Sequence, residues 1–265
     1  MRRLRIIIFL LVCLPIPAWS LEYFTVRVLD QKPQPRENFV QGLEILDGYL
    51  YVSTGNYGMS HLLRYRFADG VLEAGKKLNA GIFAEGLTVF GDNIYQLSWQ
   101  NKAMLVYRKS DLMFLHTLPI KGEGWGLTHN REELIYSDGS DNLYFISADT
   151  ADITRTIAVT QEGRPVKRLN ELEWIDDAIW ANIWQSNRIV IIDPANGEVT
   201  ASINLQGLLP PQDHRPNTDV LNGIARDPAD GSIWVTGKRW PWIYQIELAP
   251  AIDDRETQQS TVDSR

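Results

Sequence analysis

The chain has little cysteine and no excess of positive charge. Only one of its 265 residues is Cys, at position 13, which excludes a disulfide framework and a zinc site built from several cysteines. Lys and Arg number 26 against 33 Asp and Glu, and this acidic balance argues against a protein that binds nucleic acid or another polyanion. With 44% hydrophobic and 22% charged residues, the composition excludes a disordered protein, a collagen and a coiled coil.

A long hydrophobic run is also missing at the N-terminus. Three arginines among the first five residues precede an apolar run over 6–16, which is too short to span a bilayer as a helix. The small residues Ala18 and Ser20 then fit a cleavage site. Residues 1–20 are therefore predicted to be a secretory signal peptide, with a mature chain from Leu21 that is periplasmic or secreted and has no stable membrane association. An uncleaved anchor is the alternative, and the short run disfavours it.

Familiar catalytic and metal-binding motifs are scarce. No Gly-x-Ser-x-Gly elbow occurs, although this alone does not exclude Ser-His-Asp catalysis. The four histidines lie far apart, without the short spacing of a zinc site. A Pro-rich segment over 206–218 is either a lid or a passive surface loop. The polar segment 251–265 is predicted to be a disordered tail.

Five internal repeats organise the rest of the chain. Each has a polar or aromatic residue, then Gly or Glu, then Leu or Ile, and the repeats follow one another at 40 to 52 residues. They begin at Gln41, Glu85, Trp125, Asn170 and Asn222. Each is followed by a turn and a second strand, and then by a third strand, predicted over 62–66, 103–107, 142–146, 188–192 and 242–246. Fourth strands are predicted over 109–119, 153–159 and 199–205.

Short strands that recur every 40 to 52 residues indicate an all-β fold, a five-bladed β-propeller over residues 21–250. A β-sandwich is the alternative, but it does not account for five matching hairpins. The strand-like segment 21–30 is expected to complete the last blade and close the ring.

The repeats predict a binding site at one end of the central channel. In a propeller the start of the first strand and the end of the second strand meet at the same face. The second-strand ends are Gly55, Trp99, Gly139, Trp184 and Lys238. Equivalent positions thus hold a carboxylate, amides, a lysine and tryptophans, as expected for a pocket with convergent polar groups.

Glu85 is the only acid in this set. Apolar walls would raise its pKa and suit it to acid/base chemistry near neutrality. Lys238 is expected to stabilise an oxyanion or to pair with Glu85. Structural roles stay open: each tryptophan packs between blades in one interpretation, and Glu85 is an ion-pair partner in another.

Seven segments, in order along almost the whole chain, resemble the motifs of the plant and bacterial glutaminyl-peptide cyclotransferases. They are FVQGLE (39–44), FAEGLT (83–88), YQLSW (95–99), EGWGLT (123–128), LNELE (169–173), VLNGIA (220–225) and VTGK (235–238). The resemblance implies a five-bladed propeller that cyclises the N-terminal glutamine of peptides and proteins to 5-oxoproline and releases ammonia.

The resemblance also implies residue roles. Glu85 would be the general acid/base, and Asn170 and Lys238 would position and polarise the γ-carboxamide. The pocket would be formed by Phe39, Gln41, Phe83, Trp99, Trp125 and Trp184. No cofactor is required for this chemistry, and the resemblance further implies a structural calcium in the central channel, whose ligands the sequence does not identify.

Two other functions remain open at this point. A calcium-dependent propeller lactonase or hydrolase would use Glu85, Asn170 and Asn222 as metal ligands, since oxygen ligands suit a hard cation. A non-catalytic propeller would bind a peptide or glycan through its tryptophan-lined face.

Overall fold

The computed structural model describes residues 21–251. The predicted signal peptide and all but the first residue of the predicted tail therefore lie outside the described residues. Within the described range the fold is all-β, and none of its helices has the length and hydrophobicity needed to cross a membrane.

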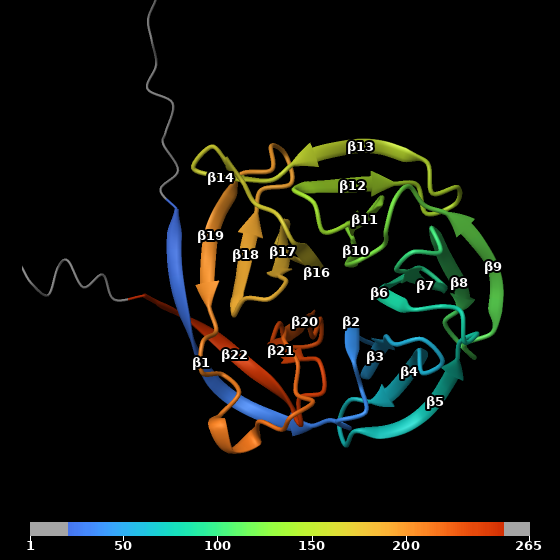
Figure 1. Cartoon of the computed structure of the whole chain (residues 1–265), viewed down its shortest axis with the longest axis horizontal. Helices are drawn as coiled ribbons and strands as arrows, with labels where there is room; N and C mark the ends of the chain where they lie inside the picture. The colour runs from blue at the N-terminus through green and yellow to red at the C-terminus, as the bar shows by residue number, and fades with distance from the viewer. Residues whose placement is uncertain (1–20, 252–265) are drawn as a thin grey trace, which may run out of the picture.

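The sheets stand in a ring around a central axis, which gives a propeller-like fold (Figure 1). Three sheets have four antiparallel strands each. The first contains β2 (Val40–Leu46), β3 (Tyr49–Thr54), β4 (His61–Arg66) and β5 (Val71–Lys77). The second contains β6 (Ala84–Phe90), β7 (Asn93–Ser98), β8 (Ala103–Arg108) and β9 (Phe114–Pro119). The third contains β10 (Leu127–His129), β11 (Leu134–Ser137), β12 (Asn142–Ile146) and β13 (Ile153–Ala158).

An eight-stranded sheet completes the ring. Half of it contains β16 (Leu169–Ile175), β17 (Ala178–Ile183), β18 (Arg188–Ile192) and β19 (Val199–Asn204). The other half contains β1 (Glu22–Pro33), β22 (Trp242–Pro250), β21 (Ile233–Gly237) and β20 (Leu221–Arg226). A small hairpin of β14 (Thr160–Gln161) and β15 (Arg164–Pro165) and the 3₁₀ helix η1 (Pro211–Asp213) lie outside this pattern.

Tight turns between β-branched and aromatic runs explain the hairpins. Asp47 and Gly48 both have positive φ, at 54° and 77°, which gives the turn between β2 and β3 the twist of its strands. Asp176 and Asp177 do the same between β16 and β17, at 49° and 61°. The third strands lie where the sequence predicts them, and β22 extends further because it pairs with β1.

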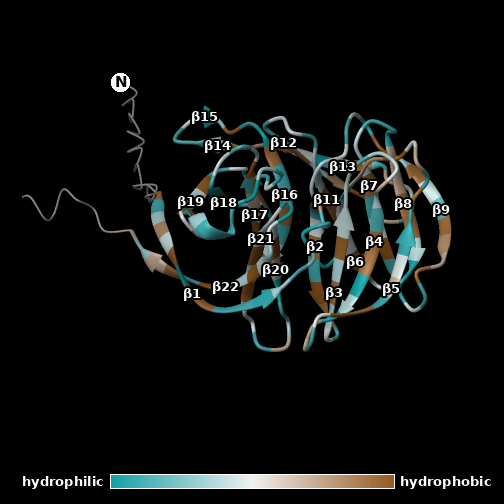
Figure 2. Ribbon diagram, turned by 60° about the horizontal axis from the view of Figure 1, so that its bottom comes forward, coloured by the Kyte–Doolittle hydropathy of each residue, from teal (hydrophilic) through white to brown (hydrophobic). Residues whose placement is uncertain are grey.

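The hydrophobic core is divided among the spaces between neighbouring sheets. Figure 2 shows hydrophobic residues along the strands of the ring, while the β14–β15 hairpin at one end is hydrophilic. One cluster joins Ile135 and Phe145 of the third sheet to Leu172 and Ile179 of the next strands, and the other neighbouring sheets pack in the same way. Stability therefore depends on every sheet packing against two neighbours.

The innermost strands approach so closely that a side chain does not fit between them. A Cβ on Gly86 would lie 2.5 Å from the backbone nitrogen of Leu127, and one on Gly42 would lie 2.4 Å from that of Leu87. In the fourth repeat Glu171 takes the equivalent place. Its carboxylate accepts hydrogen bonds from the backbone N–H of Leu43 at 3.2 Å and of Ile224 at 2.9 Å, which ties β16 to β2 and β20.

The N-terminal strand closes the ring, as the sequence predicts for residues 21–30. β1 pairs antiparallel with β22 from Phe24–Pro250 to Pro33–Trp242, and so forms the outer strand beside β20–β22. It also pairs parallel with β19 over Glu22–Phe24, a contact that the sequence does not indicate. β5 and the β14–β15 hairpin are likewise absent from the sequence-based prediction.

The segment 206–218 is anchored at the periphery of the ring. Leu208 and Leu209 are buried in the core between the two halves of the eight-stranded sheet. The indole of Trp242 donates to Asp213 at 3.0 Å, and η1 lies beside β1 and β22 at the outside of Figure 1. This placement favours the structural interpretation of the segment over a lid.

Candidate active site

All nine predicted site residues meet around one pocket at one end of the ring. The pocket has a volume of about 360 Å³. It is lined by Phe39, Gln41, Phe83, Glu85, Trp99, Trp125, Asn170, Trp184 and Lys238, together with Gln185, Asp219 and Val220. Asn222, which the repeats also place at this end, lies behind the pocket wall and is fully buried.

Irregularities in the inner strands direct the polar side chains. The register of β6 against β7 shifts between Ala84 and Leu87, and Glu85 lies in that bulge. The same shift surrounds Gln41 in β2, Asn170 in β16 and Asn222 in β20. A β-bulge re-aims a side chain, so the recurring bulge explains why these four residues leave the regular alternation of their strands.

Aromatic rings form most of the wall. Phe83 contacts Trp99 edge-on at 5.6 Å between ring centroids, and Trp125 contacts Trp184 in the same way at 5.4 Å. Two glycines at second-strand ends make room for these rings. A Cβ on Gly55 would lie 2.3 Å from the Phe83 ring, and one on Gly139 would lie 2.7 Å from Trp125. Where a second strand ends in glycine rather than tryptophan, an aromatic ring from another part of the chain thus fills the space.

Glu85 is 6% exposed and has few polar partners. Burial raises its pKa well above the usual value, the positive charge of Lys238 lowers it, and the negative charge of Glu123 raises it. The amide of Gln41 donates a hydrogen bond to Glu85 Oε1 at 2.9 Å, and Asn222 donates to the Gln41 carbonyl at 3.4 Å. Because Asn222 donates to the carbonyl oxygen of the Gln41 side chain, the NH₂ group of Gln41 is the one that faces Glu85.

Lys238 is 5% exposed and lies over the ring of Phe39, with its Nζ 4.9 Å from the ring centre. Burial lowers its pKa, while Glu85 and Asp219 raise it. Within the described residues it forms no direct ion pair with Glu85, so the predicted pairing acts only at longer range. Lys238 is therefore available as a donor to a bound molecule.

Three lining residues escape the repeat comparison, and one of them carried a signal in the sequence. Val220 occupies the position two residues before the repeat start, where Phe39 and Phe83 also lie. Asp219 precedes it, and Gln185 follows Trp184 directly. Comparing the flanking positions of all repeats would have found Val220, whereas a φ of 60° at Gln185 is visible only in the structure.

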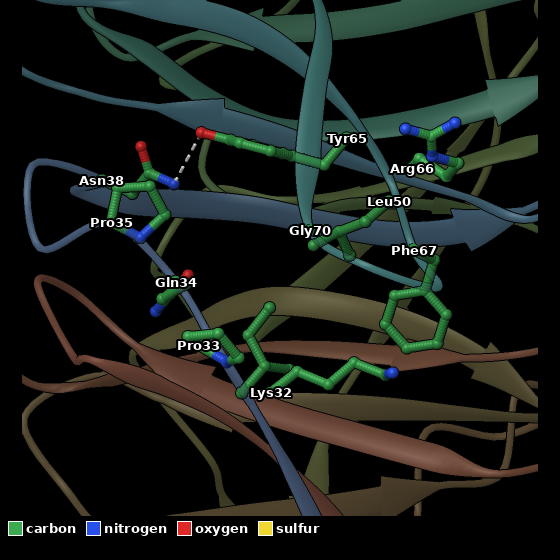
Figure 3. A pocket seen from close by; sticks show the side chains of 11 residues that line it. Lys32, Pro33, Gln34, Pro35, Asn38, Leu50, Tyr65, Arg66, Phe67 and Gly70 are labelled. Atoms are coloured by element: carbon green, nitrogen blue, oxygen red, sulfur yellow. Dashed lines mark hydrogen bonds between the residues drawn. The ribbon is translucent and has the colours of Figure 1, made fainter.

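Two other hollows differ in kind from this pocket. One of about 590 Å³ lies at the opposite end of the ring, among the last residues of the inner strands, including Glu44 and Glu173. The other, shown in Figure 3, lies beside the linker after β1, where Asn38 donates to the hydroxyl of Tyr65 at 3.2 Å. Its volume of about 20 Å³ holds at most about one water molecule, which excludes a substrate.

The carboxylates of the channel are a poor match to a calcium site. Glu44, Glu171 and Glu173 are buried, and each accepts backbone N–H groups, from Val89, Ile224 and Arg226 among others. Among residues 21–251, no three His, Cys, Asp or Glu side chains converge as metal ligands. The acidic side chains of residues 21–251 thus do not by themselves provide the ligands of a calcium site.

Comparisons with known proteins agree on one family. The model of the glutamine cyclotransferase family matches residues 8–248. A glutaminyl-peptide cyclotransferase of Arabidopsis thaliana is 37% identical over 235 residues, which cover 85% of this chain and 72% of the relative. The crystal structure of Myxococcus xanthus glutaminyl cyclase matches with a TM-score of 0.81 and 31% identity, over 88% of this chain and 100% of that one.

Proposed function

This chain belongs to the glutamine cyclotransferase family, and we infer that it cyclises the N-terminal glutamine of peptides and proteins to 5-oxoproline, with Glu85 as the acid/base residue. The observation that carries the assignment of Glu85 is its position: a buried carboxyl in an aromatic pocket, where Lys238 is the cation that acts on it among residues 21–251, and does so at longer range.

The reaction needs no nucleophile from the protein. The α-amino nitrogen of the substrate attacks the carbon of its own γ-carboxamide, a new C–N bond forms, and the old C–N bond breaks to release ammonia. Glu85 accepts the proton that the attacking amine loses and donates it to the leaving nitrogen. A carboxyl whose pKa is raised by burial is suited to both transfers near neutral pH. Holding the two ends of the glutamine together adds the advantage of proximity.

Asn170 and Lys238 complete the proposed chemistry. Both line the pocket, and both offer N–H donors to the carboxamide oxygen as negative charge develops on it. The rings of Phe39, Phe83, Trp99, Trp125 and Trp184 exclude water and hold the aliphatic part of glutamine. We assign Gln41 a second task, which is to hold Glu85 through its amide.

The bridge that Glu171 makes between inner strands supports a preference for chain ends. Beyond the pocket, the carboxylate of Glu171 bridges β2 and β20 through two backbone hydrogen bonds. This bridge lies across the inner strands beyond the pocket, which favours a substrate that enters by its terminus over a chain that threads through the ring. This supports peptides and proteins with N-terminal glutamine as substrates.

Counting β1 with β20–β22 gives five sets of four strands, and we propose that each set is one blade of a five-bladed propeller over residues 21–250. The composition of residues 1–20 supports export to the periplasm or beyond. A structural calcium stays a prediction; a higher melting temperature in calcium than in EDTA would support it, and equal values would remove it.

The decisive experiment offers the purified protein a dipeptide that begins with glutamine. We expect ammonia to appear in step with a peptide that has lost the mass of one ammonia, in the presence of EDTA as well. Glu85→Gln should abolish turnover and leave the unfolding transition in place, while Glu132→Gln, an exposed acid, should retain turnover. No product from wild-type protein between mildly acidic and mildly basic pH would refute the function, and turnover by Glu85→Gln would remove Glu85 from its role.

A further inference from the structure

A carboxylate lies behind the aromatic wall, between two of its tryptophans. Oε2 of Glu123 accepts a hydrogen bond from the indole of Trp99 at 2.8 Å and from the indole of Trp125 at 3.0 Å. Its other oxygen accepts from the Gln100 side chain at 3.4 Å. Glu123 does not itself line the pocket. Its contact with the pocket is therefore made through the two rings.

This carboxylate joins two halves of the wall. Trp99 packs edge-on against Phe83 on one side, and Trp125 packs edge-on against Trp184 on the other. Among the ring pairs of the described residues, Trp99 and Trp125 make no direct contact. Because one oxygen atom accepts from both indoles, the angle between the two halves depends on Glu123.

The repeat pattern shows that this position departs from its equivalents. Two residues before the repeat start, the first and second repeats have Phe39 and Phe83, whose rings line the pocket. The third repeat has Glu123 at that position. The third repeat thus has a charged hydrogen-bond acceptor where the first two have a ring. Its carboxylate accepts hydrogen bonds from two indoles of the wall, and its negative charge acts on Glu85.

We propose that Glu123 is a positioning residue of the active site, which holds Trp99 and Trp125 in fixed orientations around the substrate glutamine and adds a negative charge beside Glu85. The kinetic part of this proposal rests on the cyclotransferase function proposed above. Two charged groups act on Glu85, and they act in opposite directions: Lys238 favours its ionised form and Glu123 disfavours it. Asp219 acts in turn on Lys238.

The first test does not depend on activity. Residues 21–251 contain eight tryptophans, so a ¹⁵N-indole-labelled sample gives few resonances. Trp99→Phe and Trp125→Phe assign the two of interest. In Glu123→Ala those two resonances should move most, because each indole loses its charged acceptor. In Glu123→Gln they should stay closer to wild type, since an amide oxygen still accepts both hydrogen bonds.

The second test uses kinetics with a Gln-initiated dipeptide. Glu123→Ala should raise KM by about tenfold, which is the cost expected for losing hydrogen bonds to a charged acceptor. Glu123→Gln should restore KM to within about twofold of wild type, because it restores the acceptor. It should also move the acidic limb of the pH profile of kcat/KM to lower pH, because Glu85 then ionises without a negative neighbour. Glu132→Gln removes one exposed charge from the turn between β10 and β11 and should leave both KM and the acidic limb unchanged.

The outcomes separate the possible failures. Unmoved indole resonances, a wild-type KM in Glu123→Ala, or a KM in Glu123→Gln as high as in Glu123→Ala would each overturn the proposal. If Glu123→Ala does not fold, the position of the acidic limb in Glu123→Gln decides, and an unmoved limb overturns it. Inactivity of the wild-type enzyme would refute the function, whereas the indole resonances would still test the positioning.

Discussion

At the scale of single residues, the site depends on two opposite charges around Glu85. Lys238 lowers the pKa of that carboxyl and Glu123 raises it, against a larger increase from burial. The two neighbours therefore set the pH of the acidic limb in the profile of kcat/KM. Neither forms a direct hydrogen bond to Glu85 in the described structure. Changing either charge should move the same limb of the profile, but in opposite directions.

Lys238→Met tests the positive side of this balance. Loss of the cation raises the pKa of Glu85, so the acidic limb of kcat/KM should move to higher pH, opposite to the shift in Glu123→Gln. Loss of a donor to the developing oxyanion should also lower kcat by about 100-fold. Because Lys238 is buried, the variant should keep or gain stability in chemical denaturation. Lys77→Met, an exposed change on β5, is the control, and an unmoved limb in Lys238→Met would contradict the coupling.

At the scale of elements, closure of the ring depends on β1. This strand pairs with β22 on one side and with β19 on the other, so it links both halves of the eight-stranded sheet. Phe24 and Val26 pack on the core between the two halves, while Thr25 between them is exposed. Because of this alternation, the face of β1 that carries Phe24 and Val26 should contribute most of what the strand adds to the stability of the fold.

Phe24→Ala should therefore weaken the closure without touching the site. Removing a half-buried aromatic side chain should lower the free energy of unfolding by about 2 kcal/mol, measured by urea denaturation. The kinetic constants of the folded enzyme should not change, because the pocket is built from other strands. Thr25→Ala, on the opposite face of the same strand, should cost much less. Equal losses in both variants would show that burial of Phe24 contributes no more than the exposed side chain of Thr25.

The hairpins could be predicted from the sequence because each is a local pattern. Turn residues and alternating apolar residues define the strands of each repeat, and equivalent positions then placed Gln41, Glu85 and Lys238 at one end of the ring. The parallel pairing of β1 with β19 joins residues far apart in sequence, and no local pattern encodes it. Glu123 was overlooked for a different reason: it acts behind the wall, on Trp99 and Trp125, and only the geometry shows this.

At the scale of the whole molecule, several acids lie inside the ring. Burial raises the pKa of Glu44 to about 7 and raises those of Glu171 and Glu173 well above their usual value. Glu85 shifts in the same direction. The folded chain thus keeps protons that the unfolded chain has already lost, and its stability must fall as the pH rises above about 4.5 and through the folded pKa values. His129, whose pKa burial lowers to about 4, has the opposite effect, which extends from about pH 4 to about one pH unit above its unfolded pKa of 6.5.

Between pH 6.5 and 8 the buried acids set the trend, while the last part of the His129 titration in the unfolded chain and the lowered pKa of Lys238 act in the opposite direction. For Glu44, with a folded pKa of about 7, the free energy of unfolding should fall by about 1 kcal/mol across this range, and the other buried acids add to the fall. Glu44→Gln keeps an acceptor for Thr88 and Val89 but cannot titrate, so its stability should depend less steeply on pH. Urea denaturation in EDTA at pH 6.5 and 8 measures both slopes, with Glu132→Gln as the control that keeps the wild-type slope. A wild-type slope in Glu44→Gln would contradict the assignment. A slope that flattens when calcium replaces EDTA would show instead that a bound cation holds these acids ionised.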